Sequence, residues 1–294
     1  MVPRSPGGGP QHGVARGARW HHPRMEIPHR PPRRPHAWLP LLLLSQLLVA
    51  WAWWRWGWVV GLPLMLATHA VAWWGVLAPN SPLYGPVLSR LPVQGRTAAP
   101  EAGTGSDGNE VWLTIDDGPS DDTAAVLDLL DAHGAKATFF LVGDRAATRP
   151  ELVREIVRRG HGVGNHSRSH PQACFWALGP RRMRAEILDA QRQLAEATGQ
   201  APRWFRAVVG HANPFVHAPL REAGLARVAW SARGFDAVHG DVVRVVSSIE
   251  RDLAPGAIVL LHEGAPHGRS VEMIGALLQR LDALGYRAVV PRGV

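Results

Sequence analysis

Residues 111–165 read VWLTIDDGPSDDTAAVLDLLDAHGAKATFFLVGDRAATRPELVREIVRRGHGVGN, an alternation of short apolar runs with longer amphipathic ones. The β-rich runs are VWLTI (111–115), ATFFLV (137–142) and GVGN (162–165), and they predict strands. Between them, 122–134 and 150–160 carry helical periodicity and end in glycine, which predicts helices. This segment therefore predicts consecutive β/α units and a parallel sheet.

The alternation continues to the C-terminus. Helical patterns cover 180–199, 214–223, 241–253 and 270–284, and further strands are predicted at WFR (204–206), RVAWS (227–231), AIVLLH (257–262) and YRAVV (286–290). Seven β/α units over about 185 residues favour a small or incomplete barrel over an open sheet. The sequence thus predicts an α/β domain at 111–294 with a distorted (β/α)7-type barrel.

A long apolar segment, residues 37–78, precedes this domain and is interrupted by one charge, Arg55, and a few weakly polar residues. One membrane span needs about 20 residues, so two transmembrane helices fit, with a reversal near Arg55. Eight of the 13 tryptophans lie here, near the two ends and the reversal, as expected for indoles in both headgroup layers. A cleavable signal peptide is the alternative, but the segment is too long and lacks an evident cleavage site.

The charge of +8 raises nucleic acid as a partner, but its distribution argues against one. Residues 1–36 hold seven arginines and one acid and are predicted to form a disordered basic tail, whereas 37–294 hold 25 basic and 23 acidic residues. Residues 79–110, with a small, polar, glycine-rich second half, are predicted to be a linker. Cys174 is the single cysteine, so a metal site must use histidine and carboxylate.

Notable polar residues cluster at the carboxyl ends of the predicted strands, where barrel-like β/α folds build their sites. They are Asp116, Asp117, His166, Arg206, Asp236 and His262.

Two short motifs stand out among them. Asp116 and Asp117 are adjacent carboxylates, so one could bind a metal while the other faces the reacting water, although an Asp-Gly-Pro turn is the simpler interpretation. His166 and His170 are four residues apart, and on one helical turn both rings would face the same ion. Chance pairing remains an alternative in a chain with 15 histidines.

Together the motifs resemble a known family. TIDDGP (114–119), HSRSH (166–170), the arginine of FRAVVG (205–210) and LLHE (260–263) occur in the order and approximate spacing of the polysaccharide deacetylases, carbohydrate esterase family four. That group includes peptidoglycan, chitin and chitooligosaccharide de-N-acetylases. The resemblance covers residues 111–291.

The resemblance implies a role for each residue. Asp117, His166 and His170 would bind a divalent metal, with zinc as the expected ion. Asp116 would be the general base. Arg206 would keep Asp116 ionised and oriented, His262 would protonate the leaving amine, and Asp236 would orient His262. The backbone N–H of Val209 could help to stabilise the oxyanion.

The substrate-binding loops depart from the family pattern. The usual Arg-x-Pro-aromatic-Gly is Arg-Ala-Val-Val-Gly at 206–210, and the usual Asp-x-x-Asp-Trp is replaced by a segment that keeps only Asp236 and lacks the tryptophan. Glu263 stands where aspartate is usual. His211, Asn213 and Arg233 lie in these loops, either as substrate contacts or as solvated residues.

The sequence therefore predicts a hydrolase that removes N-acetyl or N-acyl groups from amino-sugar polysaccharides or oligosaccharides, integral to a bacterial-type inner membrane. The alternatives are a deacylase of lipid-linked sugar at the membrane face and a non-catalytic glycan-binding protein. The side of the membrane stays open: the positive-inside rule favours a cytoplasmic domain, and the family's substrates favour a periplasmic one. The arginines that carry this count are Arg19, Arg24, Arg30, Arg33 and Arg34 before the spans, Arg55 between them, and Arg90 and Arg96 after them.

Overall fold

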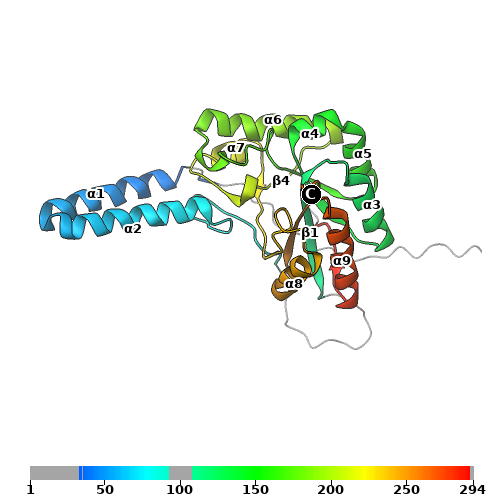
Figure 1. Cartoon of the computed structure of the whole chain (residues 1–294). Helices are drawn as coiled ribbons and strands as arrows, with labels where there is room; N and C mark the ends of the chain where they lie inside the picture. The colour runs from blue at the N-terminus through cyan, green and yellow to red at the C-terminus, as the bar shows by residue number, and fades with distance from the viewer. Residues whose placement is uncertain (1–32, 35, 93–107, 292–294) are drawn as a thin grey trace, which may run out of the picture.

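The computed structural model describes residues 33–34, 36–92 and 108–291 of the chain. Most of the predicted basic tail, and residues 93–107 of the predicted linker, lie outside these residues. The described part forms an α/β domain and a helical hairpin that projects from one side of it (Figure 1).

Among the described residues, eight strands form one parallel sheet. Their order is β5-β4-β3-β2-β1-β7-β6, and β8 pairs with the start of β1. The bounds are β1 Glu110–Gly118, β2 Ala137–Leu141, β3 Gly162–Asn165, β4 Trp204–Phe205, β5 Ala226–Arg227, β6 Ala232–Arg233, β7 Ile258–His262 and β8 Arg287–Ala288. The sheet curls into a half-barrel, so the predicted α/β class and parallel sheet are confirmed.

One predicted strand differs from the structure. RVAWS (227–231) is predicted to be a single strand, but β5 ends at its first residue, Arg227, and β6 begins just after its last, at the opposite edge of the sheet. Residues 228–231 cross between these edges. A two-residue strand cannot be distinguished from a longer one by hydrophobicity alone, because the crossing residues Val228 and Trp230 are also buried.

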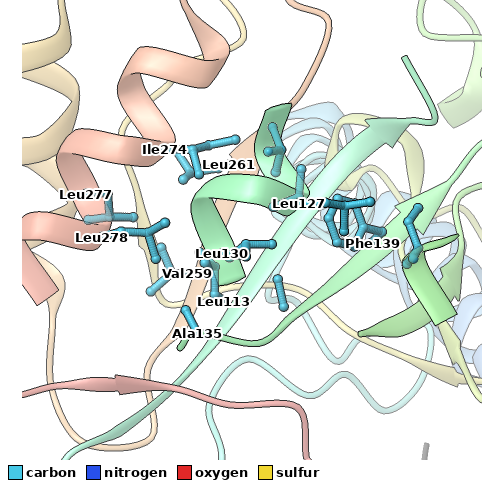
Figure 2. Close-up of a cluster of buried hydrophobic side chains, with 14 of the residues drawn as sticks. Leu113, Leu127, Leu130, Ala135, Phe139, Val259, Leu261, Ile274, Leu277 and Leu278 are labelled. Carbon is cyan, nitrogen blue, oxygen red and sulfur yellow. The ribbon is translucent and has the colours of Figure 1, made fainter. Parts of the chain in front are cut away.

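Helices cover the convex face of the sheet and form the main core with it (Figure 1). The helices of the domain are α3 Thr123–Ala132, α4 Gly143–Thr148, α5 Pro150–Arg158, α6 Pro180–Thr198, α7 His217–Glu222, α8 Val242–Asp252 and α9 Ser270–Ala283, with 3-10 helices η1 Phe175–Ala177 and η2 Val208–Gly210. Of these, α7, η1 and η2 pack with α6 in a separate cluster. Figure 2 shows Leu113 of β1 and Val259 of β7 packed among leucines of α3 and α9. Because side chains alternate along a strand, Trp112, Thr114 and Asp116 face the concave side.

The concave side holds a second hydrophobic cluster, which residues 79–92, the closing segment, cover. Trp112, Phe140, Trp204, Trp230 and Leu260 belong to this cluster, and so does Leu91, which is 2% exposed.

The closing segment hydrogen-bonds toward both ends of the sheet. The Leu88 amide donates to the Arg227 carbonyl of β5, and the Leu91 amide donates to the Gly256 carbonyl just before β7. Residues 79–92 of the predicted linker therefore pack on the domain instead of forming a free tether.

The hairpin consists of α1 Trp38–Trp56 and α2 Trp58–Leu77, which pack against each other and reverse at Gly57 with a φ of 70°. Of the described helices, α2 is the one long and apolar enough to cross a membrane. The α1 helix does not reach that hydropathy, because it carries Arg55 and several tryptophans. The predicted pair of helices is present, and their spanning of a bilayer stays a prediction.

Candidate active site

The predicted site residues converge at the carboxyl ends of the strands. Asp116 and Asp117 lie in the last part of β1, His166 follows β3, and Arg206 follows β4. His262 ends β7, and Asp236 follows β6. The neighbouring strands β1 and β7 pair in register at Asp116 and His262, which places these two residues side by side.

Three of these residues present ligand atoms to one point. One potential ligand atom each of Asp117, His166 and His170 lies within 4.8 Å of the other two. Asp117 Oδ1 is 3.0 Å from His170 Nε2 and 3.4 Å from His166 Nε2. This oxygen is buried, yet it accepts no well-directed hydrogen bond among the described residues.

The hydrogen bond of the His166 ring also fits a metal ligand. Its Nδ1 lies 2.9 Å from the carbonyl oxygen of Arg206, which can only accept, so Nδ1 carries a proton and Nε2 is the ring nitrogen that can bind a metal. This nitrogen faces Asp117 Oδ1, so a cation between the two atoms would be bound by both, with the Arg206 carbonyl fixing the orientation of the ring. The donor set of two imidazoles and one carboxylate fits a catalytic divalent metal.

The local backbone at the histidines differs from the prediction. Residues 166–170 do not form a helical turn; they form an irregular loop in which Ser167 and His170 have φ values of 68° and 53°. The structure therefore brings the two histidines together, but not through the helical spacing that the sequence suggested. The loop, rather than a helix face, brings both rings to Asp117, with ring centres 5.0 Å apart.

Two residues that the sequence analysis missed hold this loop. Glu186 of α6 is 1% exposed and accepts hydrogen bonds from the backbone N–H groups of Arg168 and Ser169 and from the Ser169 hydroxyl. Asn165 accepts from the Ser167 N–H. A carboxylate among the apolar positions of α6 was the available signal for Glu186, since an unpaired buried acid is costly.

A second pair, Asp116 and Arg206, is buried in the concave face. Arg206 is fully buried and donates from Nη1 to Asp116 Oδ1 and to the Thr114 hydroxyl, both at 2.7 Å, and from Nη2 to the Ala229 carbonyl at 3.0 Å. Burial lowers the pKa of the guanidinium, and the Asp116 carboxylate opposes this effect. Asp116 Oδ2 lies 3.8 Å from His166 Nε2, so the carboxylate borders the metal position.

A third pair, Asp236 and His262, lies beside the first two. Asp236 accepts from the backbone N–H of His262 at 2.6 Å and from its Nδ1 at 3.0 Å. Burial alone would lower the pKa of His262, but the Asp236 carboxylate, helped by Asp116 and Asp117, raises it to about 9. The imidazole is therefore held as an acid at neutral pH.

Backbone strain is concentrated at this rim. Among the described residues, five non-glycine residues have positive φ: Asp117 near the end of β1, and Ser167, His170, Val209 and Phe235 in segments that follow strands. Such conformations cost about 1–3 kcal/mol each and persist where the surroundings enforce them, which is common at functional sites. Val209, in η2 just after Arg206, is 39% exposed.

The other residues of the altered loops differ in their contacts. Asn213 donates to the carbonyls of Trp176 and Leu178 and is 3% exposed, so it supports the loop. Glu263 is buried and accepts from the hydroxyls of Ser120 and Thr123, and burial raises the pKa of its carboxyl. Glu263 therefore connects the loop after β7 to the loop after β1.

Comparisons with known proteins match this arrangement. A sequence model of the polysaccharide deacetylase family matches residues 104–228, a range that contains Asp116, Asp117, His166, His170 and Arg206. A chitooligosaccharide deacetylase from Bradyrhizobium sp. (strain ANU 289) is 42% identical over 180 residues, which cover 60% of this chain and 81% of the relative. A peptidoglycan-N-acetylglucosamine deacetylase from Bacillus cereus is 34% identical over 183 residues, covering 61% of this chain and 84% of the relative.

A solved structure agrees with the sequence relatives. The family 4 carbohydrate esterase from Streptomyces lividans, in complex with acetate, superposes with a TM-score of 0.57 at 32% identity. The match covers 62% of this chain and 92% of the esterase.

Proposed function

The chain belongs to the polysaccharide deacetylase family, whose members are hydrolases of the N-acetyl amide bonds of sugars, and we propose that it performs this hydrolysis with a divalent metal held by Asp117, His166 and His170. It is a deacetylase of glycans that contain N-acetylglucosamine. The observation that carries the proposal is the convergence of the Asp116–Arg206 and Asp236–His262 pairs on the three ligand atoms.

The metal proposed here is zinc, because two imidazoles and one carboxylate with an open position suit it. The buried, unpaired Oδ1 of Asp117 supports a cation at this point. When bound, the metal supplies Lewis acidity toward the amide carbonyl and the attacking water.

The chain's own groups handle the protons. Asp116 is proposed to accept the proton of the attacking water, and Arg206 positions it through a short charge-assisted hydrogen bond. His262 is proposed to donate its proton to the leaving amine nitrogen, because an amide anion is too poor a leaving group at neutral pH. Asp236 is a positioning residue that orients His262. The N–H of Val209 is a further proposed donor to the oxyanion.

A non-catalytic glycan-binding protein would need neither the base nor the acid. The presence of both, each with its own positioning partner, argues against that alternative.

The direct test is acetate release by the full chain in detergent. We expect acetate from N-acetylchitooligosaccharides or from peptidoglycan fragments, loss of activity after chelation, and recovery when zinc is restored. Metal analysis of the purified protein should show about one equivalent per chain. Full activity after exhaustive metal removal would contradict the metal assignment.

The pH profile gives a second prediction. Asp236→Asn removes the carboxylate that raises the pKa of His262 from 6.5 to about 9, so the pKa falls. The alkaline limb of kcat/KM should therefore move to lower pH by roughly one to two units. Asp252→Asn, at an exposed position on α8, should leave the limb in place. An unmoved limb in Asp236→Asn would exclude His262 as the titrating acid.

The same pair links pH to stability. The folded pKa of His262 lies above its unfolded value, so the Asp236 contact stabilises the protein fully below about pH 6.5. This contribution is lost as the pH rises through about 9.

We further propose that α1 and α2 anchor the enzyme in a membrane. Their surfaces expose many leucines, valines and tryptophans, and at 1.5 Å per residue a helix the length of α2 spans about 30 Å, the thickness of the hydrocarbon core. The catalytic domain at 111–294 stays part of this proposal, with residues 79–92 of the predicted linker packed against it. A reporter fused after Val294 would identify the side of the membrane that holds the site.

Deacylation of a lipid-linked sugar is the second candidate, and the docking of the hairpin favours it. The Val76 carbonyl at the end of α2 accepts from the N–H of Ala212, just after η2, and the Trp73 ring lies 5.5 Å from that of Trp176. The membrane end of the anchor thus contacts a loop of the site rim. Activity on polyprenyl-linked sugar without activity on soluble oligosaccharides would select this candidate.

A further inference from the structure

A stack of alternating aromatic rings and guanidinium groups runs from the buried site to the surface. The Arg206 Cζ lies 4.2 Å from the centre of the Phe140 ring and 5.8 Å from that of Trp230. The Arg233 Cζ lies 5.3 Å from the Trp230 ring centre and 3.7 Å from that of Phe235. Phe140 is fully buried and Phe235 is 49% exposed, so Arg233 is the outer of the two guanidinium groups in the stack.

Arg233 faces the same side of the sheet as the acid of the proposed reaction. It lies on β6 and pairs in register with Leu260 of β7, so the two side chains share a face. Leu260 belongs to the concave cluster, and His262 is two residues further along the same strand. Arg233 therefore lies on the concave face, level with the residue of β7 that comes two positions before His262.

This arginine has no anionic partner in the part of the chain that the structure describes. Among the described residues, no carboxylate lies within 4.0 Å of its nitrogens and its side chain makes no hydrogen bond, and its Nε is buried without an acceptor. Burial lowers the pKa of the guanidinium, and the more distant Asp236 carboxylate opposes this effect. The nearby Asp236 is engaged by His262. By contrast, the other guanidinium of the stack, Arg206, is matched by Asp116.

The stack leaves Arg233 ready to bind an anion. Two rings hold the plane of the guanidinium, so little side-chain freedom remains to be lost on binding. A planar fork of N–H donors then suits the paired oxygens of a carboxylate or a phosphate.

The backbone on the C-terminal side of Arg233 is fixed by local packing. Phe235 has a φ of 60°, which is a strained value for an aromatic residue, and this conformation places its ring over the guanidinium. A Cβ at Gly234 would come within 2.6 Å of Val245 of α8, so the loop is pressed against that helix.

We infer that Arg233 binds an anionic group of the substrate, a carboxylate or a phosphate carried close to the N-acetylated sugar. The inference rests on the proposed function, because it places this anion on the glycan that the site deacetylates. A carboxylate would come from a neighbouring acidic sugar, and a phosphate would come from an ester at the sugar's C1, as in a lipid carrier. Both sources share the chemistry that a stacked guanidinium recognises.

The test measures binding and not turnover. The full chain in detergent is titrated by ligand-observed NMR with three probes: neutral diacetylchitobiose, the N-acetylglucosamine–N-acetylmuramic acid disaccharide, which carries a carboxylate, and N-acetylglucosamine 1-phosphate. We expect at least one anionic probe to bind about tenfold more tightly than chitobiose. The anionic probe that is preferred identifies the source of the charge.

Matched variants assign the preference to the residue. In Arg233→Gln the preference should fall to within about twofold, whereas Arg244→Gln, which removes the same charge from an exposed position on α8, should retain it. Arg233→Lys keeps the charge without the planar fork and should retain a reduced preference. The wild-type preference itself needs no variant and so does not depend on how well Arg233→Gln folds.

Two outcomes would overturn the inference: equal or absent binding of all three probes by the wild-type chain, or a preference that survives in Arg233→Gln. Acetate release separates this result from the proposed function. Anion-selective binding without deacetylation would refute the proposed function alone, and deacetylation without anion selectivity would refute the role of Arg233 alone.

Discussion

Asp116→Asn in the full chain is expected to lower kcat by about 10²- to 10⁴-fold, because it removes the group proposed to accept the proton of the attacking water. Asparagine keeps an oxygen that can accept the hydrogen bond from Arg206, so the substitution removes the charge of Asp116 and keeps this contact. The measurement is acetate release at saturating substrate, together with the metal content of each preparation.

The metal content decides how a loss of activity is read. Asp116 is not one of the three clustered ligand residues, so Asp116→Asn should keep its metal, whereas Asp117→Asn should lose it. Asp252→Asn makes the same chemical change at an exposed position and should behave as the wild type. If Asp116→Asn retained both full metal and full activity, another group would have to be the base.

Arg206→Met is expected to destabilise the protein by about 3–5 kcal/mol, since it leaves the charge of Asp116 buried without its partner. Arg206 also donates to Thr114 and Ala229 and packs on the Phe140 ring, and methionine replaces none of these hydrogen bonds. The midpoint of thermal unfolding should fall by roughly 10 °C.

The surface offers a control for this change. Arg192 on α6 is exposed and, among the described residues, pairs with Asp189 three residues earlier, so Arg192→Met should alter stability by no more than about 0.5 kcal/mol. Arg206→Lys keeps the charge but lacks the planar guanidinium that reaches three acceptors. Its stability should lie between those of Arg206→Met and the wild type. Equal stabilities for Arg206→Met and Arg192→Met would show that the buried pair contributes nothing to the fold.

The sequence predicted the identity of the clustered residues better than it predicted their backbone. Residue type and strand-end position were enough to place Asp116, Arg206 and His262 at one rim, because parallel strands end at a common edge. The helical turn assigned to His166–His170 was wrong, since side-chain periodicity says nothing about a loop fixed by tertiary hydrogen bonds. Those bonds come from Glu186, about 20 residues away, and no local pattern connects the two.

The fold shows the same division. Long, strongly apolar strands such as β1 and β7 were predicted within a few residues, because burial on both faces gives continuous hydrophobic runs. The two-residue strands β5 and β6 were not separated, because their pairing depends on which edge of the sheet the chain reaches and not on local composition.

The segment that seals the concave side also determines where the folded unit begins. The backbone N–H groups of Leu88 and Leu91 donate to the carbonyls of Arg227 and Gly256, and the Leu91 side chain packs in the concave cluster. A protein trimmed to start at Glu110, the first residue of the sheet, would expose those carbonyls and an apolar opening to neighbouring molecules, a recognised route to aggregation. Soluble preparations should therefore retain the chain from Pro79 onward, although the sequence between that residue and the first strand has the composition of a spacer.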